Sequence, residues 1–356
     1  MRSRPRGPRA GLVGSPTLLN VRSTLEELLA SGRVALADGA TGTNYFRMGL
    51  EAGDAPELWN VEHPERVQAL HREFVDAGAD IILTNTFGGN RHRLQLHHAD
   101  NRVAELNRRA AELARAVADA APRPVVVAGS VGPTGELLEP LGTLTEADAV
   151  DAFTEQIAAL RDGGADVAWI ETMSAPEEMR AAARAAIAVG MPYTITASFD
   201  TAGRTMMGVH PAELPGALSE LDPAPLAIGA NCGVGAPDIL VTLLAMDGAD
   251  GDRRLISKGN CGIPEFRGSE IVYSGTPALM GEYAHLAVDA GASIVGGCCG
   301  TSPDHLRAMR AALDAHGAGP KPTLDSIVER VGPLANASPD ATTAVRRGGR
   351  SRPARA

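Results

Sequence analysis

The feature that most constrains the fold is an eightfold alternation of short apolar segments and amphipathic helical patterns. The apolar segments predict strands at residues 34–37, 81–84, 125–128, 167–170, 193–197, 226–229, 255–257 and 293–295. Helical periodicity follows them at residues 64–77, 101–121, 144–162, 176–189, 211–220, 237–246, 276–290 and 303–315. Such alternation builds a parallel sheet covered by helices, and eight units can close it into a (β/α)8 barrel.

An open, doubly wound sheet would show the same alternation. That fold usually carries the motif G-x-G-x-x-G after its first strand. Residues 38–43 (DGATGT) lack this spacing. We therefore predict a single-domain α/β protein with a (β/α)8 TIM barrel domain over residues 23–318, in which a short helix at residues 24–29 comes before the first strand.

Both ends of the chain are rich in arginine. Residues 1–22 contain five arginines and no acidic residue, and the last sixteen residues contain five more. We expect residues 1–22 to be a disordered basic tail and residues 319–356 to be a largely disordered extension. Without residues 1–22 and 336–356 the formal charge is about −19, which argues against nucleic acid as the partner.

Composition also bears on the compartment. No apolar run reaches the roughly 20 residues that cross a membrane, and Gly11, Gly14 and Pro16 interrupt any secretory signal. The four cysteines, two of them adjacent, form a poor disulfide framework. We therefore expect a cytoplasmic protein with reduced thiols and no membrane partner, and a homo-oligomer is compatible with the sequence.

Three cysteines are the strongest candidates for chemistry. Cys298 and Cys299 follow the last predicted strand within residues 296–300 (GGCCG), and Cys232 ends the sixth. The carboxyl ends of barrel strands share one face, which holds the active site. Three thiolates suit Zn²⁺ and leave a fourth position for an exchangeable ligand. We predict a Zn²⁺ site on these cysteines, the alternative being small buried core residues, and we expect Cys261 to be no ligand.

Two carboxylates are predicted at the same face. Asp38 ends the first strand and Glu171 the fourth, so they either bind an ammonium group, act as acid and base, or cap the following loops. Glycines beside Asp38 and within residues 86–89 expose N–H groups that could hold a carboxylate. A substrate thiol on thiolate-bound Zn²⁺ would lose its proton, which favours S-alkylation over hydrolysis.

These motifs resemble those of the homocysteine S-methyltransferases. The resemblance covers about residues 24–316 and rests on residues 38–43, 84–89 (TNTFGG), 229–233 (GANCG) and 296–300. The family includes betaine–homocysteine methyltransferase and the homocysteine module of cobalamin-dependent methionine synthase.

The resemblance implies a (β/α)8 barrel with Zn²⁺ on the three cysteines and L-homocysteine bound through its thiolate. It places Asp38 and Glu171 near the amino group of homocysteine, and the backbone of Gly39 and Thr86 near its carboxylate. Asn260 would fill the open metal position before substrate arrives. The family has alanine at the position of Cys261.

The methyl donor is predicted to be small, because the chain has no room for folate and cobalamin modules. Residues 54–60 and 198–208 resemble bacterial proteins labelled betaine–homocysteine methyltransferases, so glycine betaine is the predicted donor. A quaternary ammonium favours an aromatic cage, for which the candidates are Trp59, Tyr45, Phe46 and Phe87. Against betaine, mammalian-type enzymes have tyrosine where this chain has Thr172, and they carry a C-terminal dimerisation arm.

Three alternatives stay open. In the first alternative, the methyl donor would be S-methylmethionine or another sulfonium. In the second, the barrel would be a homocysteine-binding module that works with a separate corrinoid protein. The third is a metal hydrolase, which normally needs His and carboxylate ligands that are missing here at the required spacing.

Overall fold

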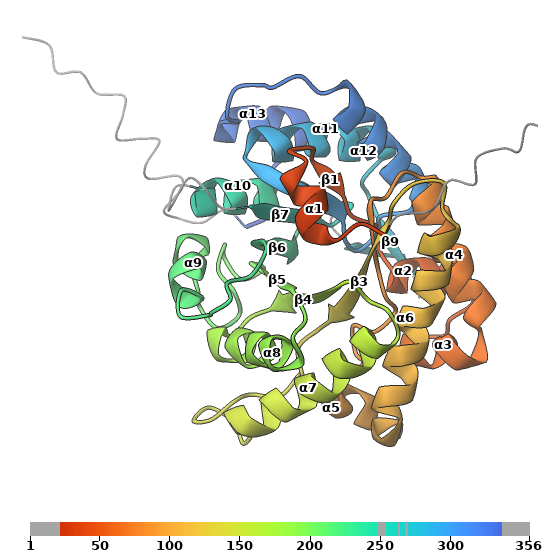
Figure 1. Cartoon of the computed structure of the whole chain (residues 1–356). Coiled ribbons are helices and arrows are strands. Elements are labelled where there is room, and N and C mark those ends of the chain that lie inside the picture. Colours follow the sequence, from red (N-terminus) through yellow and green to blue (C-terminus); the bar gives the residue numbers. More distant parts are fainter. Residues whose placement is uncertain (1–21, 248–253, 263, 268–269, 337–356) are drawn as a thin grey trace, which may run out of the picture.

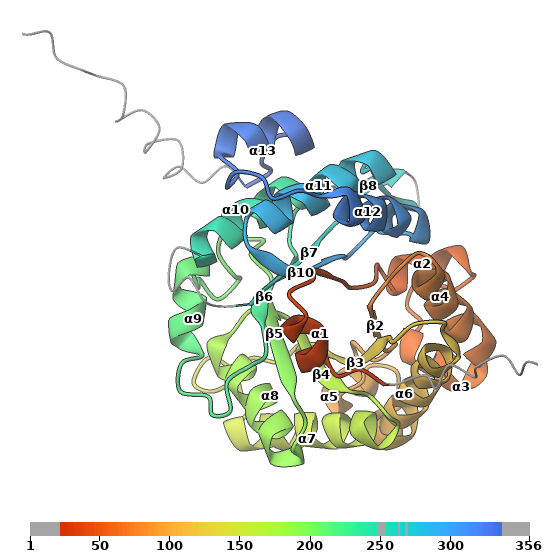
Figure 2. The same cartoon turned by 45° about the horizontal axis from the view of Figure 1, so that its top comes forward.

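Eight parallel strands form one sheet that curves into a barrel, enclosed by helices (Figures 1 and 2). The computed structural model describes residues 22–247, 254–262, 264–267 and 270–336. The expected tails at residues 1–21 and 337–356 lie outside the described residues. In sheet order the strands are β1 (Ala35–Leu36), β10 (Ala292–Gly297), β7 (Leu255–Gly259), β6 (Ile228–Cys232), β5 (Tyr193–Ala197), β4 (Val167–Met173), β3 (Val126–Val131) and β2 (Ile81–Leu83).

The ring closes between its first and last strands. Ala37, directly after β1, forms a parallel bridge with Ile81 of β2. Backbone hydrogen bonds continue this contact, from Asp38 N–H to the Ile81 carbonyl at 3.0 Å and from Asp80 N–H to the Leu36 carbonyl at 2.7 Å. The predicted (β/α)8 barrel is therefore confirmed.

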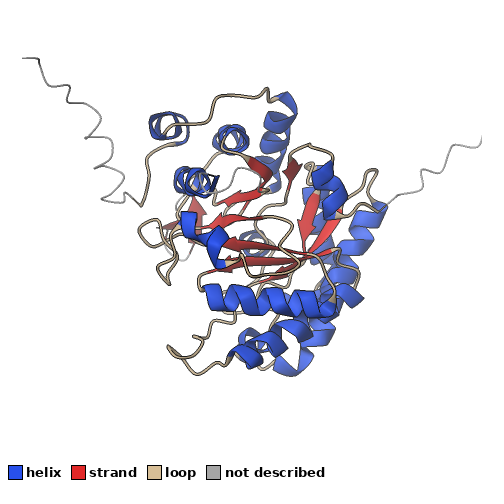
Figure 3. Cartoon of the chain, turned by 60° about the vertical axis from the view of Figure 1, so that its left-hand side comes forward, coloured by secondary structure: helices blue, strands red, loops and turns tan. Residues whose placement is uncertain are grey.

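Helices surround the strands on their outer side, as Figure 3 shows in blue around red. The long ones are α4 (Pro64–Asp76), α6 (Val103–Ala120), α7 (Glu146–Asp162), α8 (Pro176–Val189), α10 (Ala236–Asp247), α11 (Pro277–Asp289) and α12 (Pro303–Ala315). The short ones are α2 (Gly42–Arg47), α3 (Trp59–Glu62), α5 (Arg91–Gln95), α9 (Leu214–Ala217) and the 3₁₀ turns η1 (Pro56–Leu58), η2 (Asp100–Arg102) and η3 (Pro211–Glu213). Within the described residues no helix is long and apolar enough to cross a membrane.

Helix α1 (Leu25–Ala30) covers the amino-terminal end of the barrel interior (Figure 1). Its start is set by a capping box between Thr24 and Glu27. Its buried residues Leu25 and Leu29 pack in one apolar cluster with interior side chains of the strands, among them Trp169. The opposite, carboxyl-terminal end is thus the one left for a functional site.

Three local elements differ from the prediction. The helix expected at residues 211–220 is only η3 followed by the single turn α9, because Pro215 and Gly216 are poor helix formers. An unpredicted antiparallel pair, β8 (Pro264–Arg267) and β9 (Glu270–Tyr273), lies between β7 and α11. Helix α13 (Leu324–Val331) lies within the expected C-terminal extension and packs on α10 and α11.

A buried histidine in α4 gives a pH prediction. His71 is 2% exposed, neither ring nitrogen has a hydrogen-bond partner among the described residues, and burial lowers its pKa to about 4. The unfolded chain takes up this proton near pH 6.5, so the folded state loses stability as the pH falls from about 6.5 towards 4. At pH 5 the loss is about 2 kcal/mol.

We expect His71→Leu to reduce this acid destabilisation. The measurement is the free energy of unfolding at pH 7 and pH 5, with His97→Gln on the exposed surface as the control for loss of an imidazole. An unchanged difference between the two pH values in His71→Leu would show that the prediction is wrong.

Candidate metal and substrate site

The three predicted cysteines meet at the carboxyl end of the barrel. Cys232 is the last residue of β6, and Cys298 and Cys299 directly follow β10. Their sulfur atoms lie within 4.8 Å of one another, and all three residues are partly exposed. Among the described residues this is the only group of three potential metal ligands of the Cys, His and carboxylate types.

The backbone of the double-cysteine turn is held by hydrogen bonds to the neighbouring loop. Cys298 N–H donates to the Gly259 carbonyl at 2.8 Å, and Cys261 N–H donates to the Cys299 carbonyl at 2.9 Å. The flanking glycines are required by space. A Cβ on Gly297 would overlap the Thr301 side chain, and Gly300 combines a φ of +80° with close contact to the ring of Tyr273.

A buried amide connects the cysteines to β4. The Asn231 carboxamide oxygen accepts from Thr172 N–H at 2.8 Å and from the Thr196 hydroxyl at 2.7 Å. Its amide nitrogen donates to Thr172 Oγ1 at 2.7 Å and contacts Cys298 Sγ at 3.9 Å. Thr172 and Cys232 both have a positive φ, near +60°, which costs energy in residues with a Cβ. The Asn231 side chain therefore holds the strained residue Thr172 in place and contacts one of the three thiols.

The chemistry of the three thiols fits a soft divalent cation. Hydrogen bonds from Cys232 and Cys298 lower the pKa of Cys299 to about 3. Hydrogen bonds with Cys298 and Cys299 raise the pKa of Cys232. Thiolate sulfur is a ligand that Zn²⁺ and other soft cations prefer, and sulfur atoms within 4.8 Å of one another are close enough to bind a single ion.

Asp38 is fully engaged by the protein itself. Its side chain is 1% exposed, with Oδ2 accepting from Leu83 N–H at 2.7 Å and Oδ1 accepting from the Lys258 ammonium at 3.0 Å. Burial raises the pKa of Asp38, and the Lys258 cation opposes this shift.

Glu171 lies in β4 and has a different environment. Its Oε1 accepts from the Ser130 hydroxyl at 2.5 Å. Burial raises the pKa of Glu171 to about 7 against the opposing charge of Lys258. The two carboxylates predicted from the sequence are thus both at this end of the barrel, coupled to the same cation.

Lys258 had no role in the sequence prediction. It lies in β7 and is 2% exposed, and its ammonium group is 5.7 Å from the centre of the Trp169 ring. Burial acts to lower the pKa of Lys258, but the charges of Asp38 and Glu171 outweigh it and raise the pKa. A charged residue near the carboxyl end of an otherwise apolar strand was the available signal.

The other residues predicted to bind substrate lie near these three charged side chains and the cysteines. Gly39 packs so tightly that a Cβ would be 2.6 Å from the Thr301 carbonyl. The Thr86 hydroxyl donates to the Ser130 carbonyl at 2.7 Å. Asn260 links two loops, because its Nδ2 donates to the Gly233 carbonyl at 2.8 Å and its Oδ1 accepts from Cys299 N–H at 3.0 Å.

The four aromatic candidates for a donor cage divide into two pairs. Trp59 and Tyr45 are buried, with ring centres 5.2 Å apart, and the Arg66 guanidinium lies 4.9 Å from the Trp59 ring. Phe46 and Phe87 are 50% and 40% exposed. The structure does not bring the four rings together on an accessible surface.

The sequence analysis gave no role to Tyr273, which lies at the end of β9. Its hydroxyl forms a further hydrogen bond with the Cys299 sulfur. The sequence did not predict this contact, because it depends on the unpredicted pair of strands β8 and β9.

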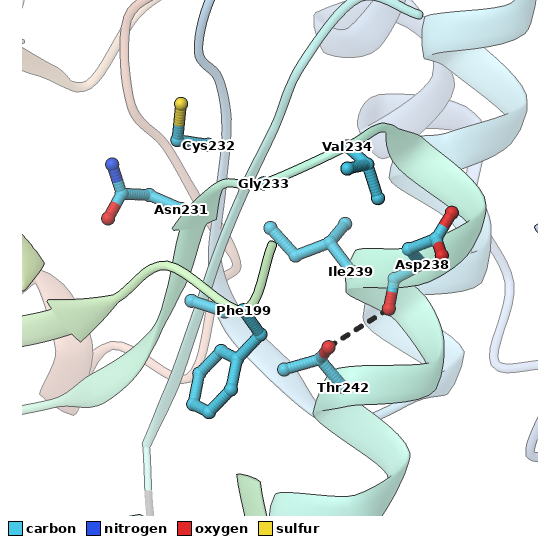
Figure 4. Close-up of a pocket in the computed structure, with 9 residues that line it drawn as sticks. Phe199, Asn231, Cys232, Gly233, Val234, Asp238, Ile239 and Thr242 are labelled. Carbon is cyan, nitrogen blue, oxygen red and sulfur yellow. Dashed lines mark hydrogen bonds between the residues drawn. The ribbon is translucent and has the colours of Figure 1, made fainter. Parts of the chain in front are cut away.

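A small cavity lies behind Cys232, between β6 and α10 (Figure 4). Phe199, Ile239 and Thr242 line it, and the Cys232 sulfur is directed away from them. The cavity has room for about one water molecule. Asn231 and Cys232 also line it, so it borders the candidate site on the side of α10.

Comparison with known proteins agrees with this geometry. A sequence model of the homocysteine S-methyltransferase family matches residues 35–313. The chain belongs to this family.

Two curated relatives of this homocysteine S-methyltransferase family member are named methionine synthase. The protein from Mycobacterium leprae is 33% identical over 307 residues, covering 81% of this chain and 25% of the relative. The one from Mycobacterium tuberculosis is 32% identical over 301 residues, covering 80% and 25%. The chain therefore spans about a quarter of the length of these relatives.

Solved structures show the same family resemblance. The metallated form of the homocysteine methyltransferase MmuM from Escherichia coli has a TM-score of 0.67 at 24% identity, covering 80% of this chain and 98% of that one. Its oxidized form has a TM-score of 0.63 at 26% identity, covering 78% and 95%. The fold of this family member is thus shared with an enzyme known in a metallated state.

Crowding at the double-cysteine turn gives a stability prediction. Gly297→Ala should lower the free energy of unfolding by about 1–3 kcal/mol, because its Cβ would overlap Thr301. Gly317→Ala is the matched control, since a Cβ there meets no atom within 4 Å. Denaturant titration measures both, and equal stability of the two variants would contradict the prediction.

Proposed function

We propose that this protein transfers a methyl group from a small donor to the thiol of L-homocysteine, with Zn²⁺ held by Cys232, Cys298 and Cys299. The observation that carries the proposal is the meeting of three thiols within 4.8 Å at the active face of the barrel. Membership of the homocysteine S-methyltransferase family and the similarity to a metallated enzyme support it.

Zn²⁺ bound by three thiolates would keep a fourth, substrate thiol in its nucleophilic thiolate form near neutral pH. The protein supplies the position of its ligands. Asn231 and Asn260 hold the loops that carry the cysteines, through hydrogen bonds to Thr172 and to Cys299 N–H. A reducing compartment such as the cytoplasm would keep the three thiols available.

The amino-acid part of homocysteine would lie against the polar group beside the cysteines. We assign its ammonium group to the two buried acidic side chains, Asp38 and Glu171. We assign its carboxylate to the backbone near Gly39 and Thr86. The burial of both acidic side chains supports a site that removes a zwitterion from water.

Glycine betaine is our proposed donor, with S-methylmethionine or another sulfonium as the alternative. Phe46 and Phe87 offer exposed aromatic faces for a methylated cation. A second alternative is a homocysteine-binding module that receives the methyl group from a separate corrinoid protein. The relatives named methionine synthase extend well beyond the part that matches this chain, which is compatible with a module that works with other parts.

Metal analysis tests the core of the proposal. We expect freshly reduced protein to bind about one Zn²⁺ per chain, and Cys298→Ser to lose most of it, because a neutral hydroxyl is a poor replacement for a thiolate. Cys261→Ser is the matched control, since Cys261 is buried outside the cluster of three and should leave the zinc content unchanged. Equal zinc content in the two variants would disprove the assignment.

Product analysis tests the reaction and the donor. Zinc-loaded protein is incubated with homocysteine and either glycine betaine or S-methylmethionine, and methionine is measured. We expect methionine from glycine betaine. Methionine only from the sulfonium would keep the reaction and change the donor. Methionine only after addition of a methylated corrinoid protein would identify a module that needs a partner.

A further inference from the structure

The loop that follows β2, residues 84–90, is held by buried side chains from elements on the outside of the barrel. Three are amides that are 0% exposed and one is a carboxylate that is 5% exposed: Asn60 of α3, Asn107 of α6, Gln156 of α7 and Glu57 of η1. Each forms a hydrogen bond with the backbone of the loop. Burial of a polar group costs free energy unless it is hydrogen-bonded. The four side chains therefore hold this backbone in one conformation.

Gln156 reaches the loop from α7. Its Nε2 lies 2.8 Å from the Thr86 carbonyl oxygen and 3.3 Å from the Ser130 carbonyl oxygen. Because a carbonyl oxygen only accepts, the group between the two must be the donating nitrogen of the amide. Gly89 makes room for it, since a Cβ there would lie 2.9 Å from Nε2. Gln156 thus ties the loop after β2 to the end of β3.

The hydrogen bond to the Thr86 carbonyl also fixes the direction of the next N–H. The C=O of Thr86 and the N–H of Phe87 belong to one planar trans peptide, so they point in opposite directions. Helix α7 lies on the outer side of the sheet (Figures 1 and 2). Because the carbonyl faces α7, the Phe87 N–H points away from α7, on the side of the barrel axis.

The Phe87 N–H has no hydrogen-bond partner among the described residues. The other three N–H groups of residues 86–89 donate to the Thr84 carbonyl, the Thr86 carbonyl and the Glu57 carboxylate, at 2.9, 2.9 and 2.7 Å. A buried backbone donor is normally paired. An N–H that the fold leaves unpaired beside a proposed substrate site is suited to an anionic group of the substrate.

We propose that Gln156 is a positioning residue for the substrate, which directs the Phe87 N–H by holding the carbonyl of the same peptide. This inference rests on the proposed function, and it adds a residue of an outer helix that does not itself touch homocysteine. The substrate carboxylate receives the directed N–H as a charge-assisted hydrogen bond. Selectivity for thiols that carry a carboxylate therefore depends on a side chain of α7.

Binding selectivity tests the inference. Calorimetry on zinc-loaded protein gives the dissociation constants of L-homocysteine and of 3-aminopropane-1-thiol, which has the same thiol and amino group but no carboxylate. Their ratio reports the contribution of the carboxylate without turnover. Gln156→Met keeps a similar side-chain volume and removes the donor. We expect it to reduce the ratio about tenfold, since hydrogen bonds to charged groups contribute about that much.

Asn107→Leu is the matched control. Asn107 is also 0% exposed, and its Nδ2 donates to a carbonyl of the same loop, that of Gly89, at 2.8 Å. It does not hold the peptide between Thr86 and Phe87, so the ratio should stay close to that of wild-type protein even though stability falls. An equal loss of selectivity in both variants would show that any disturbance of the loop has this effect, and would overturn the inference.

A second variant shows whether the reach of the amide matters. Gln156→Asn keeps a polar side chain but is one methylene shorter, so it falls short of the two carbonyls. We expect the same loss of selectivity as in Gln156→Met, and a ratio equal to that of wild-type protein would contradict the inference. Zinc content should be the same in all variants. A ratio that falls only where zinc is also lost would place the effect at the cysteines and contradict the inference.

Two outcomes with wild-type protein separate this inference from the proposed function. If the protein binds both thiols equally well, the loop does not receive the carboxylate, so the role of Gln156 is wrong and methyl transfer stands. If it binds neither thiol, the proposed function fails as well.

Discussion

Closure of the parallel sheet is the constraint on which the rest of this structure depends. The closing contacts between β1 and β2 run through Ala37, Asp38 and Ile81, at the point where the site begins. Because all eight strands run in the same direction, their carboxyl ends converge on one face. Cys232 and Cys298 are far apart in the sequence, yet closure places their sulfur atoms within 4.8 Å. The same closure gathers Asp38, Glu171 and Lys258 beside them.

The site contains residues with strained backbone angles and buried charged side chains, and both are in contact with other buried polar groups. Cys232 and Thr172 adopt positive φ angles, and Asn231 stabilises Thr172 through hydrogen bonds and contacts the Cys298 sulfur. Lys258 and Asp38 form a buried ion pair, and removal of either partner alone would leave an uncompensated buried charge. A pre-arranged set of polar groups of this kind would suit the methyl transfer proposed above, because the groups need no reorganisation during the reaction.

The sequence was most informative where a pattern repeats or a residue type is rare. The alternation of apolar segments and helices was sufficient for the barrel, and β5, α8 and α12 have the predicted bounds. The cysteines were found because adjacent thiols at a strand end are unusual. Prediction was poorest where burial decides. The rings of Trp59 and Tyr45 lie in the core because their neighbours pack over them, and helices as short as α2 and α3 have too little periodicity to predict this.

By itself, the sequence determined the barrel and the end of it at which the three cysteines meet, because eight alternating strands and helices imply parallel strands whose carboxyl ends share one face. Only the tertiary structure decided how the charges are paired. Asp38 could have faced a substrate or a lysine. Lys258 contacts it across an intervening strand at Gly296, where a Cβ would crowd the lysine side chain. Pairing of this kind depends on distances between residues remote in the sequence, which local patterns do not contain.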